Sequence, residues 1–194
     1  METLQIDKKS TALVIIDLQK GIVARELQPY GSQTVIGNAA KLAEAFRKNS
    51  MPVFLVHVVS SEADRLNAIA DEPMFSRSHA QQMPADGSEF VPELRQSDSD
   101  IIITKKQWGA FYGTGLELQL RRRKMGTIVL CGVATNYGVE STARFAYEYG
   151  FQQVFAEDAI SSMSKEMHDA SVNYALKRMG RVRKTDEILE SLKS

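Results

Sequence analysis

Apolar residues along the chain fall into short runs, and longer stretches with helical spacing separate these runs. The strongest runs are rich in β-branched residues at consecutive positions, a pattern typical of parallel strands that helices cover on both faces. They predict four buried strands: Thr11–Ile16, Val53–Val59, Asp100–Thr104 and Thr127–Cys131. Weaker runs at Gln153–Ala156 and Arg181–Arg183 are two further strand candidates.

The stretches between the runs predict helices. Amphipathic patterns cover Thr34–Lys48, Leu116–Lys124, Tyr137–Tyr149 and Lys165–Met179, and the last two are followed by glycines, which commonly end helices. Alternating strands and helices are typical of a parallel sheet with right-handed crossovers. The 194 residues are therefore predicted to form one domain, residues 1–194, with a three-layer α/β fold.

One long stretch, Ser60–Asp98, does not follow this alternation. It contains Pro73, Pro84 and Pro92 and is rich in serine, aspartate and glutamine. Long irregular insertions inside compact domains often form the wall or lid of a pocket. The alternative is a surface excursion with one short helix, and the sequence leaves both interpretations open.

The charge balance and hydropathy of the chain limit the classes of partner that we expect it to bind. Lysine plus arginine and aspartate plus glutamate number 24 each, whereas nucleic-acid-binding chains normally carry a basic excess. The basic run Arg121–Lys124 is expected to be a solvated helix end, where cations suit the helix dipole. No apolar stretch approaches the ~20 residues that span a bilayer, and the N-terminal sequence lacks the apolar segment of a secretory signal. We expect a cytoplasmic protein with a small-molecule substrate and with no nucleic-acid or membrane partner.

The sequence predicts neither a metal site nor a cofactor. Cys131 is the only cysteine, which excludes an intramolecular disulfide and a zinc site built from several cysteines. The histidines, His57, His79 and His168, are too scattered to predict metal ligands, and His57 is expected to pack in or beside the sheet. The Gly-Thr-Gly sequence at 113–115 lacks the full spacing of a dinucleotide-binding loop.

Polar residues stand at the ends of two predicted strands. In open α/β sheets, ligands bind at the carboxyl ends of the strands. Asp17 follows the first strand, with Gln19 after it, and Lys105 and Lys106 follow the third strand. Asp17 could simply cap a helix, or it could transfer protons beside a lysine. Burial would raise its pKa and a nearby lysine would lower it, and the sequence leaves that balance open.

A glycine in the segment after Thr127–Cys131 occupies a predicted helical position, where glycine is unfavourable. The strand is expected to break at Gly132, and a helix is expected to begin near Asn136, with Thr135 or Asn136 as its cap. Gly138 then lies in the first turn, where glycine costs about 1 kcal/mol relative to alanine. Two explanations stay open: room for a ligand beside amides that can hold negative charge, or close packing of the helix on a strand.

Four segments resemble the signature blocks of the isochorismatase-like, or cysteine hydrolase, superfamily. They occur in the family's order and spacing and read ALVIIDLQ, ITKKQWGAFYGTGLELQLRRR, IVLCGVATNYGVESTARFAYEYGF and VFAEDAISS. The chain looks most similar to the uncharacterised bacterial hydrolases of the YecD type. The resemblance implies a Rossmann-like fold with a six-stranded, mostly parallel sheet between helices, and a homo-oligomer, either a dimer or a tetramer.

The resemblance also implies a catalytic triad of Asp, Lys and Cys. Asp17 matches the aspartate, and Lys105 matches the lysine because the family's lysine stands three residues before an aromatic residue, here Trp108. The family's cysteine position is occupied by Gly138, so the chain lacks the thiol that would form a thioester. Cys131 lies seven residues upstream in a predicted buried strand and is not expected to replace it.

Isochorismatases resemble this chain in having glycine at that position. They cleave a vinyl ether, and the resemblance gives Asp17 the role of the acid that protonates the vinyl carbon. It also implies a cis peptide bond at Val133–Ala134, with the amides of Ala134 and Gly138 facing the substrate. Isochorismatases have a histidine where this chain has Asn136, which is a departure from their pattern. The expected substrate-binding residues are Gln19, Trp108, Phe111, Val133, Ala134, Asn136 and Tyr137.

Three hypotheses about function follow. The first is a hydrolase of a small, anionic or carbonyl-bearing molecule that uses Asp17 and Lys105 without a cysteine nucleophile. The second is a catalytically silent member of the family that binds a small molecule. The third is a cysteine amidase whose nucleophile has been replaced by Gly138.

Overall fold

The computed structural model describes residues 4–59, 61–64, 69–71 and 84–193. One sheet has the strand order β3-β2-β1-β4-β5-β6, and every neighbouring pair is parallel. The predicted six-stranded, three-layer α/β fold is confirmed, and the sheet is all parallel rather than mostly parallel. The strands are β1 (Thr11–Ile16), β2 (Val53–Val58), β3 (Ile101–Lys105), β4 (Thr127–Val133), β5 (Gln152–Ser161) and β6 (Arg181–Arg183).

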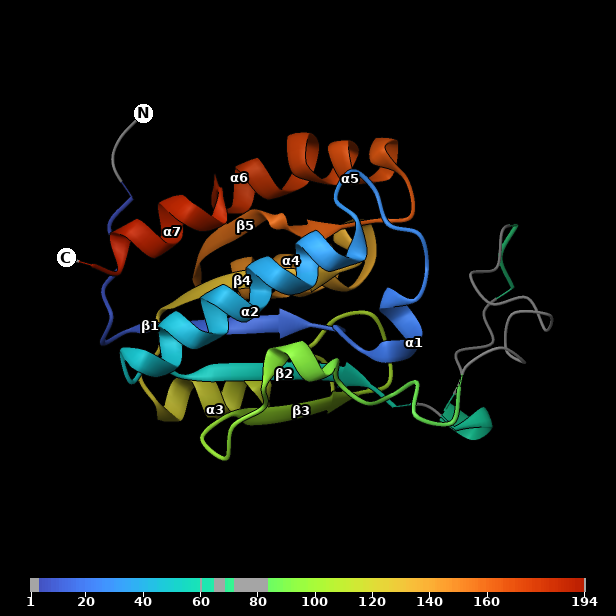
Figure 1. The fold of residues 1–194 in the computed structure, drawn as a ribbon, viewed down its shortest axis with the longest axis horizontal. Helices are drawn as coiled ribbons and strands as arrows, with labels where there is room; N and C mark the ends of the chain where they lie inside the picture. The colour runs from blue at the N-terminus through green and yellow to red at the C-terminus, as the bar shows by residue number, and fades with distance from the viewer. Residues whose placement is uncertain (1–3, 60, 65–68, 72–83, 194) are drawn as a thin grey trace.

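Helices lie on both faces of the sheet, with α2 (Ser32–Lys48) across the front and α3 (Leu116–Arg122) behind β2 and β3 (Figure 1). The buried side of α2 carries the apolar residues at three- and four-residue spacing that predicted it. The other helical segments are α1 (Lys20–Val23), α4 (Glu140–Glu148), α5 (Lys165–Ser171), α6 (Lys177–Met179) and α7 (Thr185–Ser191), the π-helical η4 (Thr135–Val139) and η5 (Val172–Leu176), and the 3-10 turns η1 (Glu62–Asp64) and η3 (Pro92–Leu94). No helix among the described residues is both long and apolar enough to cross a membrane.

The centre of the sheet is the most completely buried part of the core. All six residues of β1 are buried, and β1 lies between β2 and β4. Full burial of an aliphatic side chain contributes ~1.5–3 kcal/mol, so β1 is firmly held. The residue that follows β1 is therefore attached to one of the most rigid parts of the molecule.

The prediction that β4 breaks at Gly132 is wrong. β4 continues to Val133, and Gly132 has a φ of 114°. A Cβ on Gly132 would lie 2.0 Å from the carbonyl oxygen of Ile16, so only glycine allows β4 to approach the end of β1 this closely. The next helix begins at Thr135 as a π-helix, and Ala134 is its N-cap instead of Thr135 or Asn136.

The ends of three other strands also differ from the prediction, and β2 ends one residue early, at Val58. β3 begins one residue later than expected and includes Lys105, so this lysine is the last strand residue instead of the first loop residue. β5 extends to Ser161, five residues beyond the predicted end. Its register with β4 shifts between Leu130 and Gly132, and such irregularities are hard to read from apolar patterns.

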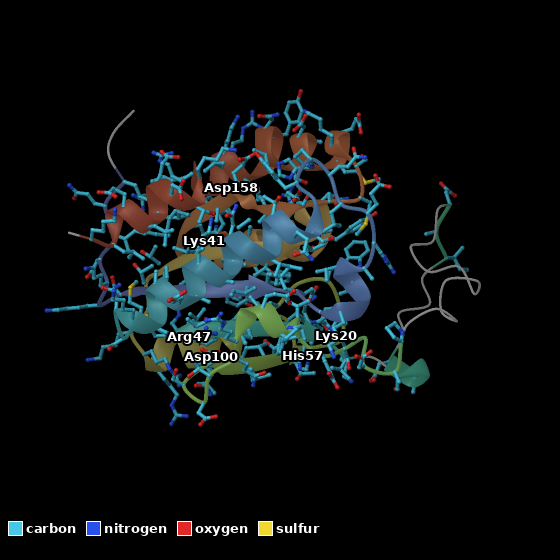
Figure 2. All side chains as sticks on the ribbon, viewed as in Figure 1. Lys20, Lys41, Arg47, His57, Asp100 and Asp158 are labelled. Carbon is cyan, nitrogen blue, oxygen red and sulfur yellow. The ribbon has the colours of Figure 1, made fainter. Side chains whose placement is uncertain are left out.

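A partly buried ion pair joins the end of α2 to the residue before β3. Arg47 Nη2 lies 2.7 Å from Asp100 Oδ2, and Arg47 Nε donates to Asp100 Oδ1 at 3.0 Å. Figure 2 labels both side chains at this end of the sheet. Arg47 also donates to the carbonyl oxygen of Leu94 at 3.0 Å, so one guanidinium fixes the segment that leads into β3.

Residues 86–91 of the stretch Ser60–Asp98 lie against the residues that follow β1. The backbone of Lys20 donates to Glu89 O at 2.9 Å, and the Lys20 ammonium contacts the carboxylates of Asp86 at 2.7 Å and Glu89 at 2.8 Å. This part therefore stands beside the Asp17 end of the sheet, as a pocket wall would. Pro73 and His79 lie outside the described residues.

Candidate active site

Asp17 and Lys105 meet at the carboxyl end of the sheet. Asp17 follows β1 and Lys105 ends β3, and β2 lies between these strands. Neighbouring strands are about 4.8 Å apart, so the long lysine side chain is needed to cross β2. Lys105 Nζ lies 2.7 Å from Asp17 Oδ2. The pair lies beside the β1–β4 boundary, where the direction of strand succession reverses and ligands of open α/β folds bind.

All three N–H groups of the Lys105 ammonium have hydrogen-bond acceptors. Its three donors match three acceptors: Asp17 Oδ2 and the carbonyl oxygens of Gln107 at 3.0 Å and Trp108 at 2.9 Å. The side chain is only 2% exposed. Lys105 therefore fixes one oxygen of Asp17 and the loop after β3 at the same time.

The second oxygen of Asp17 is different from the first. Asp17 Oδ1 is buried and has no hydrogen-bond partner among the described residues. Burial raises the pKa of Asp17 to about 6, although the charge and hydrogen bond of Lys105 act in the opposite direction. Burial therefore outweighs the lysine in the balance that the sequence left open. Asp17 also has a φ of 52°, a left-handed conformation that aspartate and asparagine tolerate better than most residues.

Gly138 lies directly beside this carboxyl group. A Cβ on Gly138 would be 3.1 Å from Asp17 Oδ2, 3.5 Å from Trp108 O and 2.9 Å from Ile16 Cγ2. The last distance is shorter than real Cβ contacts, so any side chain at 138 requires the buried Ile16 methyl group to move. The structure thus brings Asp17, Lys105 and Gly138 together and leaves Gly138 closely packed.

The loop that carries Gly138 has the cis peptide bond that the resemblance implied. The Val133–Ala134 peptide bond is cis, and η4 begins directly after it. Asn136 Oδ1 accepts a hydrogen bond from Ser162 Oγ, which ties the loop to the end of β5. The ring of Tyr137 packs on that of Trp108, with centroids 4.9 Å apart, and Trp108 remains 49% exposed. Trp108 and Tyr137 are therefore placed where a bound molecule could contact them.

Gln19 does not have the role that its position suggested. Its side chain is fully buried, accepts from Val58 N at 2.8 Å, and donates to Val58 O at 3.0 Å and Ser88 O at 3.2 Å. Both amide donors are thus occupied in joining β2 to the segment at Ser88. We therefore withdraw Gln19 from the expected substrate-binding residues: a polar residue near a strand end can equally well hold two segments together.

Phe111 also lies apart from the site. Its ring packs against Phe151 and Tyr149, with centroid distances of 5.8 Å and 5.4 Å, and the residue is buried in the core. We therefore withdraw Phe111 from the expected pocket wall.

The remaining chemical candidates are structural in the described residues. Cys131 is fully buried, and burial strongly raises the pKa of its thiol, which makes it a poor nucleophile. His57 lies on the sheet as expected, between Ser88 O at 3.1 Å and Thr104 Oγ1 at 2.8 Å, and Figure 2 labels it on β2. The described residues contain no group of three or more His, Cys, Asp or Glu side chains that could hold a metal ion.

Sequence reasoning missed a polar contact beside the loop. His168 Nδ1 lies 3.0 Å from Thr135 Oγ1, and both residues are buried. An isolated histidine 33 residues away carries no periodic or motif signal, so only the fold could bring this pair together.

These features define an α/β protein with a buried carboxylate–lysine pair at the carboxyl end of a parallel sheet. The Isochorismatase domain model matches residues 11–187, and the chain belongs to the isochorismatase family, a family of hydrolases. It is 50% identical over 194 residues to the uncharacterised isochorismatase family protein YwoC of Bacillus subtilis, with all of both chains covered. It is also 50% identical to the uncharacterised isochorismatase family protein YecD of Escherichia coli O157:H7, over 97% of this chain and 100% of that protein. The resemblance to YecD-type proteins is confirmed.

Solved structures agree with this assignment. An isochorismatase family protein from Burkholderia thailandensis has a TM-score of 0.91 and 37% identity, with 98% of each chain covered. Relatives named for an activity are more distant. A probable isochorismatase of Pseudomonas chlororaphis is 28% identical, over 95% of this chain and 87% of that protein. The structure of an N-carbamoylsarcosine amidase from Thermoplasma acidophilum has a TM-score of 0.73 and 25% identity, over 91% and 97% of the two chains.

Proposed function

We propose that this protein hydrolyses a small, anionic or carbonyl-bearing molecule without a cysteine nucleophile, with Asp17 as general acid and base beside Lys105. The observation that carries the proposal is the buried, unpartnered Asp17 Oδ1 in a carboxyl group whose pKa is about 6. Such a group holds a proton in a useful fraction of molecules near neutral pH and can deliver it to an atom that contacts Oδ1.

The two oxygens of Asp17 would have different roles in acid catalysis. Lys105 donates to Oδ2, so the proton of the neutral acid belongs on Oδ1. After the proton leaves, the fixed ammonium stabilises the carboxylate that remains. Lys105 thus positions the acid and stabilises its charged form while keeping its own three contacts.

Cleavage of a vinyl ether fits these residues better than cleavage of a C–N bond. Amide hydrolysis through a thioester needs a nucleophile, and Gly138 supplies none. A vinyl ether needs an acid and water: the proton of Asp17 forms a C–H bond at the vinyl carbon, and water adds to the oxocarbenium carbon. Asp17 regains a proton from the water as it adds. The bond between this carbon and the ether oxygen then breaks as the proton of the new hydroxyl group passes to the departing oxygen, which leaves a ketone and an alcohol. The distant relative named a probable isochorismatase supports this choice.

We assign substrate binding to the loop after β4 and to the aromatic pair of Trp108 and Tyr137. The amides of Ala134 and Gly138 would face an anionic group of the substrate, beside Val133 and the side chain of Asn136. Trp108 and Tyr137 would contact its apolar part, because Trp108 is half-exposed and lies next to the Lys105 contacts. We also propose that the protein is a cytoplasmic homo-oligomer, and light scattering of the purified chain tests its assembly.

The two other hypotheses make different predictions at Gly138. A replaced cysteine implies space for a side chain, whereas a Cβ here would lie 2.9 Å from Ile16 Cγ2. This crowding favours glycine as the residue to which the site is adapted. A silent binding protein has no need of a buried carboxyl group that is partly protonated near neutral pH, because the burial of such a group is costly.

Isochorismate is the first substrate to test, with pyruvate release followed through lactate dehydrogenase. Asp17→Asn is the matched variant, because asparagine keeps the shape and tolerates the same backbone conformation but cannot ionise. We expect pyruvate release in the wild type, a loss of at least about 100-fold in Asp17→Asn, and no inhibition by iodoacetamide, since Cys131 is buried. Iodoacetamide-sensitive turnover would contradict a mechanism without a thiol.

A negative result with isochorismate requires a second step. The same assay design is then applied to other vinyl ethers and to a panel of small amides. Turnover of any of them that Asp17→Asn abolishes supports the hydrolase. Absence of turnover throughout, together with a change in the fluorescence of Trp108, the only tryptophan, on ligand addition, would show that the silent binder is the correct hypothesis.

A further inference from the structure

A line of polar side chains runs from the protein surface to the loop after β4. The ammonium of Lys184 and the hydroxyl of Tyr30 both contact the Glu157 carboxylate, the latter at 2.9 Å. Glu157 Oε1 lies 3.5 Å from His168 Nε2 on the inner side. His168 Nδ1 then lies 3.0 Å from Thr135 Oγ1. The line thus joins a carboxylate, an imidazole and a hydroxyl.

The three inner members come from three different elements. Glu157 belongs to β5, His168 to α5, and Thr135 is the first residue of η4. His168 is 1% exposed and Thr135 is fully buried. Polar groups are buried at this depth at a cost unless they are hydrogen-bonded, so the contacts hold these elements in one arrangement.

The charge of Glu157 determines the direction of the hydrogen bonds. Burial raises the pKa of Glu157, but hydrogen bonds with His168, Lys184 and Tyr30 outweigh it and lower the pKa to about 2. The ionised carboxylate can only accept, so an Nε2–H of His168 faces Glu157. In the tautomer that carries its proton on Nε2, Nδ1 accepts from the Thr135 hydroxyl, and this fixes the rotamer of Thr135.

Thr135 itself is not a nucleophile. A carboxylate, an imidazole and a hydroxyl in a line resemble an activated nucleophile. However, Thr135 has no exposed surface, whereas the Asp17 side chain keeps 8% of its surface exposed, so of the two only Asp17 borders solvent. The contacts of this line can therefore affect the site only by fixing where Thr135 lies in the loop.

Thr135 directly follows Ala134 of the cis peptide bond and begins the π-helix that holds Gly138 over Asp17. We propose that His168, aligned by Glu157, is a positioning residue that fixes Thr135 and thereby keeps the 134–138 loop closed over Asp17. The inference uses the site proposed above, but it does not depend on turnover. Loosening the loop would admit water to Asp17 and relieve its burial.

The test compares two substitutions of Thr135 in the full-length chain. Thr135→Val keeps the branched shape and loses the hydroxyl, whereas Thr135→Ser keeps the hydroxyl. The Asp17 carboxyl is titrated by carbon-13 NMR, and exchange of the amides of residues 134–138 is measured beside that of β1 and β2. No substrate is required, so the result is separate from that of the isochorismate assay.

We expect Thr135→Val to lower the Asp17 midpoint from about 6 by at least about 0.5 pH unit, toward the ordinary value, because desolvation of the carboxyl is partly lost. Loop amides should exchange about tenfold faster than in the wild type, with β1 and β2 unchanged. Thr135→Ser should retain wild-type values. Equal effects of Val and Ser, or wild-type values in Thr135→Val, would overturn the proposal.

Glu157→Gln provides a second variant if Thr135→Val does not fold. It leaves the hydroxyl of Thr135 in place but removes the charge that aligns His168. Nitrogen-15 NMR should show a preference for the Nε2–H tautomer of His168 in the wild type and a weaker preference in Glu157→Gln, with a lower Asp17 midpoint. An unchanged tautomer and an unchanged midpoint in this variant would refute the proposed alignment.

Discussion

Replacing Asp17 with asparagine should change how the free energy of unfolding depends on pH. In the folded protein, burial raises the pKa of Asp17 from 3.8 to about 6. The folded state therefore binds a proton more tightly than the unfolded state does. This contribution to stability is complete below about pH 4 and is lost as the pH rises through about 6.

The size of the effect follows from the same two values. Each pH unit of difference corresponds to ~1.36 kcal/mol, so the rise from 3.8 to about 6 amounts to about 3 kcal/mol. The asparagine side chain of the variant would stay neutral at every pH, and asparagine tolerates the left-handed backbone at this position. The free energy of unfolding of Asp17→Asn minus that of the wild type should therefore increase by about 2 kcal/mol between pH 4 and pH 7, because the unfolded state is already partly ionised at pH 4.

Urea unfolding followed by circular dichroism measures this difference at a series of pH values. Other titrating groups are the same in both proteins, so their contributions cancel when the two curves are subtracted. Equal slopes of the unfolding free energy against urea concentration are required at each pH. A difference that stays constant within about 0.5 kcal/mol from pH 4 to 7 would refute the raised pKa, and with it the role of Asp17 as an acid near neutral pH.

Three further outcomes are expected. Gly132→Ala should cost about 3 kcal/mol or more in a thermal or urea melt, because its Cβ would lie 2.0 Å from Ile16 O; a loss below 1 kcal/mol would contradict this close approach. Lys105→Met should cost about 3–5 kcal/mol at pH 7 because it leaves Asp17 without its partner, whereas the control Lys106→Met, at a 47% exposed side chain, should cost less than about 1 kcal/mol. For the active enzyme, kcat/KM should fall as the pH rises above about 6, since the protonated form of Asp17 is required; a rise would assign Asp17 as a base.

The sequence predicts the parts of the site that lie at strand ends. Asp17 and Lys105 follow or end strands with clear apolar patterns, and parallel strands bring such ends to one edge of a sheet. The pattern also predicts the helices and the layer architecture, because apolar spacing is a local property. Gly138 could be placed only through the family resemblance, since a glycine in a first helical turn has several explanations.

Other parts of the site depend on distant contacts that no local pattern encodes. Gln19 stands at a strand end like Asp17, but it is occupied by Val58 and Ser88, which lie 39 and 69 residues away. The continuation of β4 through Gly132 depends on the close approach of Ile16. Long-range packing outweighs local propensity at each of these positions, which is why sequence reasoning misjudged them.

Glycine at position 138 and an acidic role for Asp17 are consistent with each other. A thiol beside Asp17 would need the carboxylate ionised so that it could accept the thiol proton, whereas acid catalysis needs the same group protonated. Gly138 has no proton to give, and its close packing helps to bury the carboxyl group. Burial then outweighs Lys105 and raises the pKa of Asp17 to about 6. In the proposed function, glycine at 138 and the raised pKa of Asp17 therefore belong to one arrangement, in which Lys105 fixes one carboxyl oxygen and the other oxygen would carry the proton.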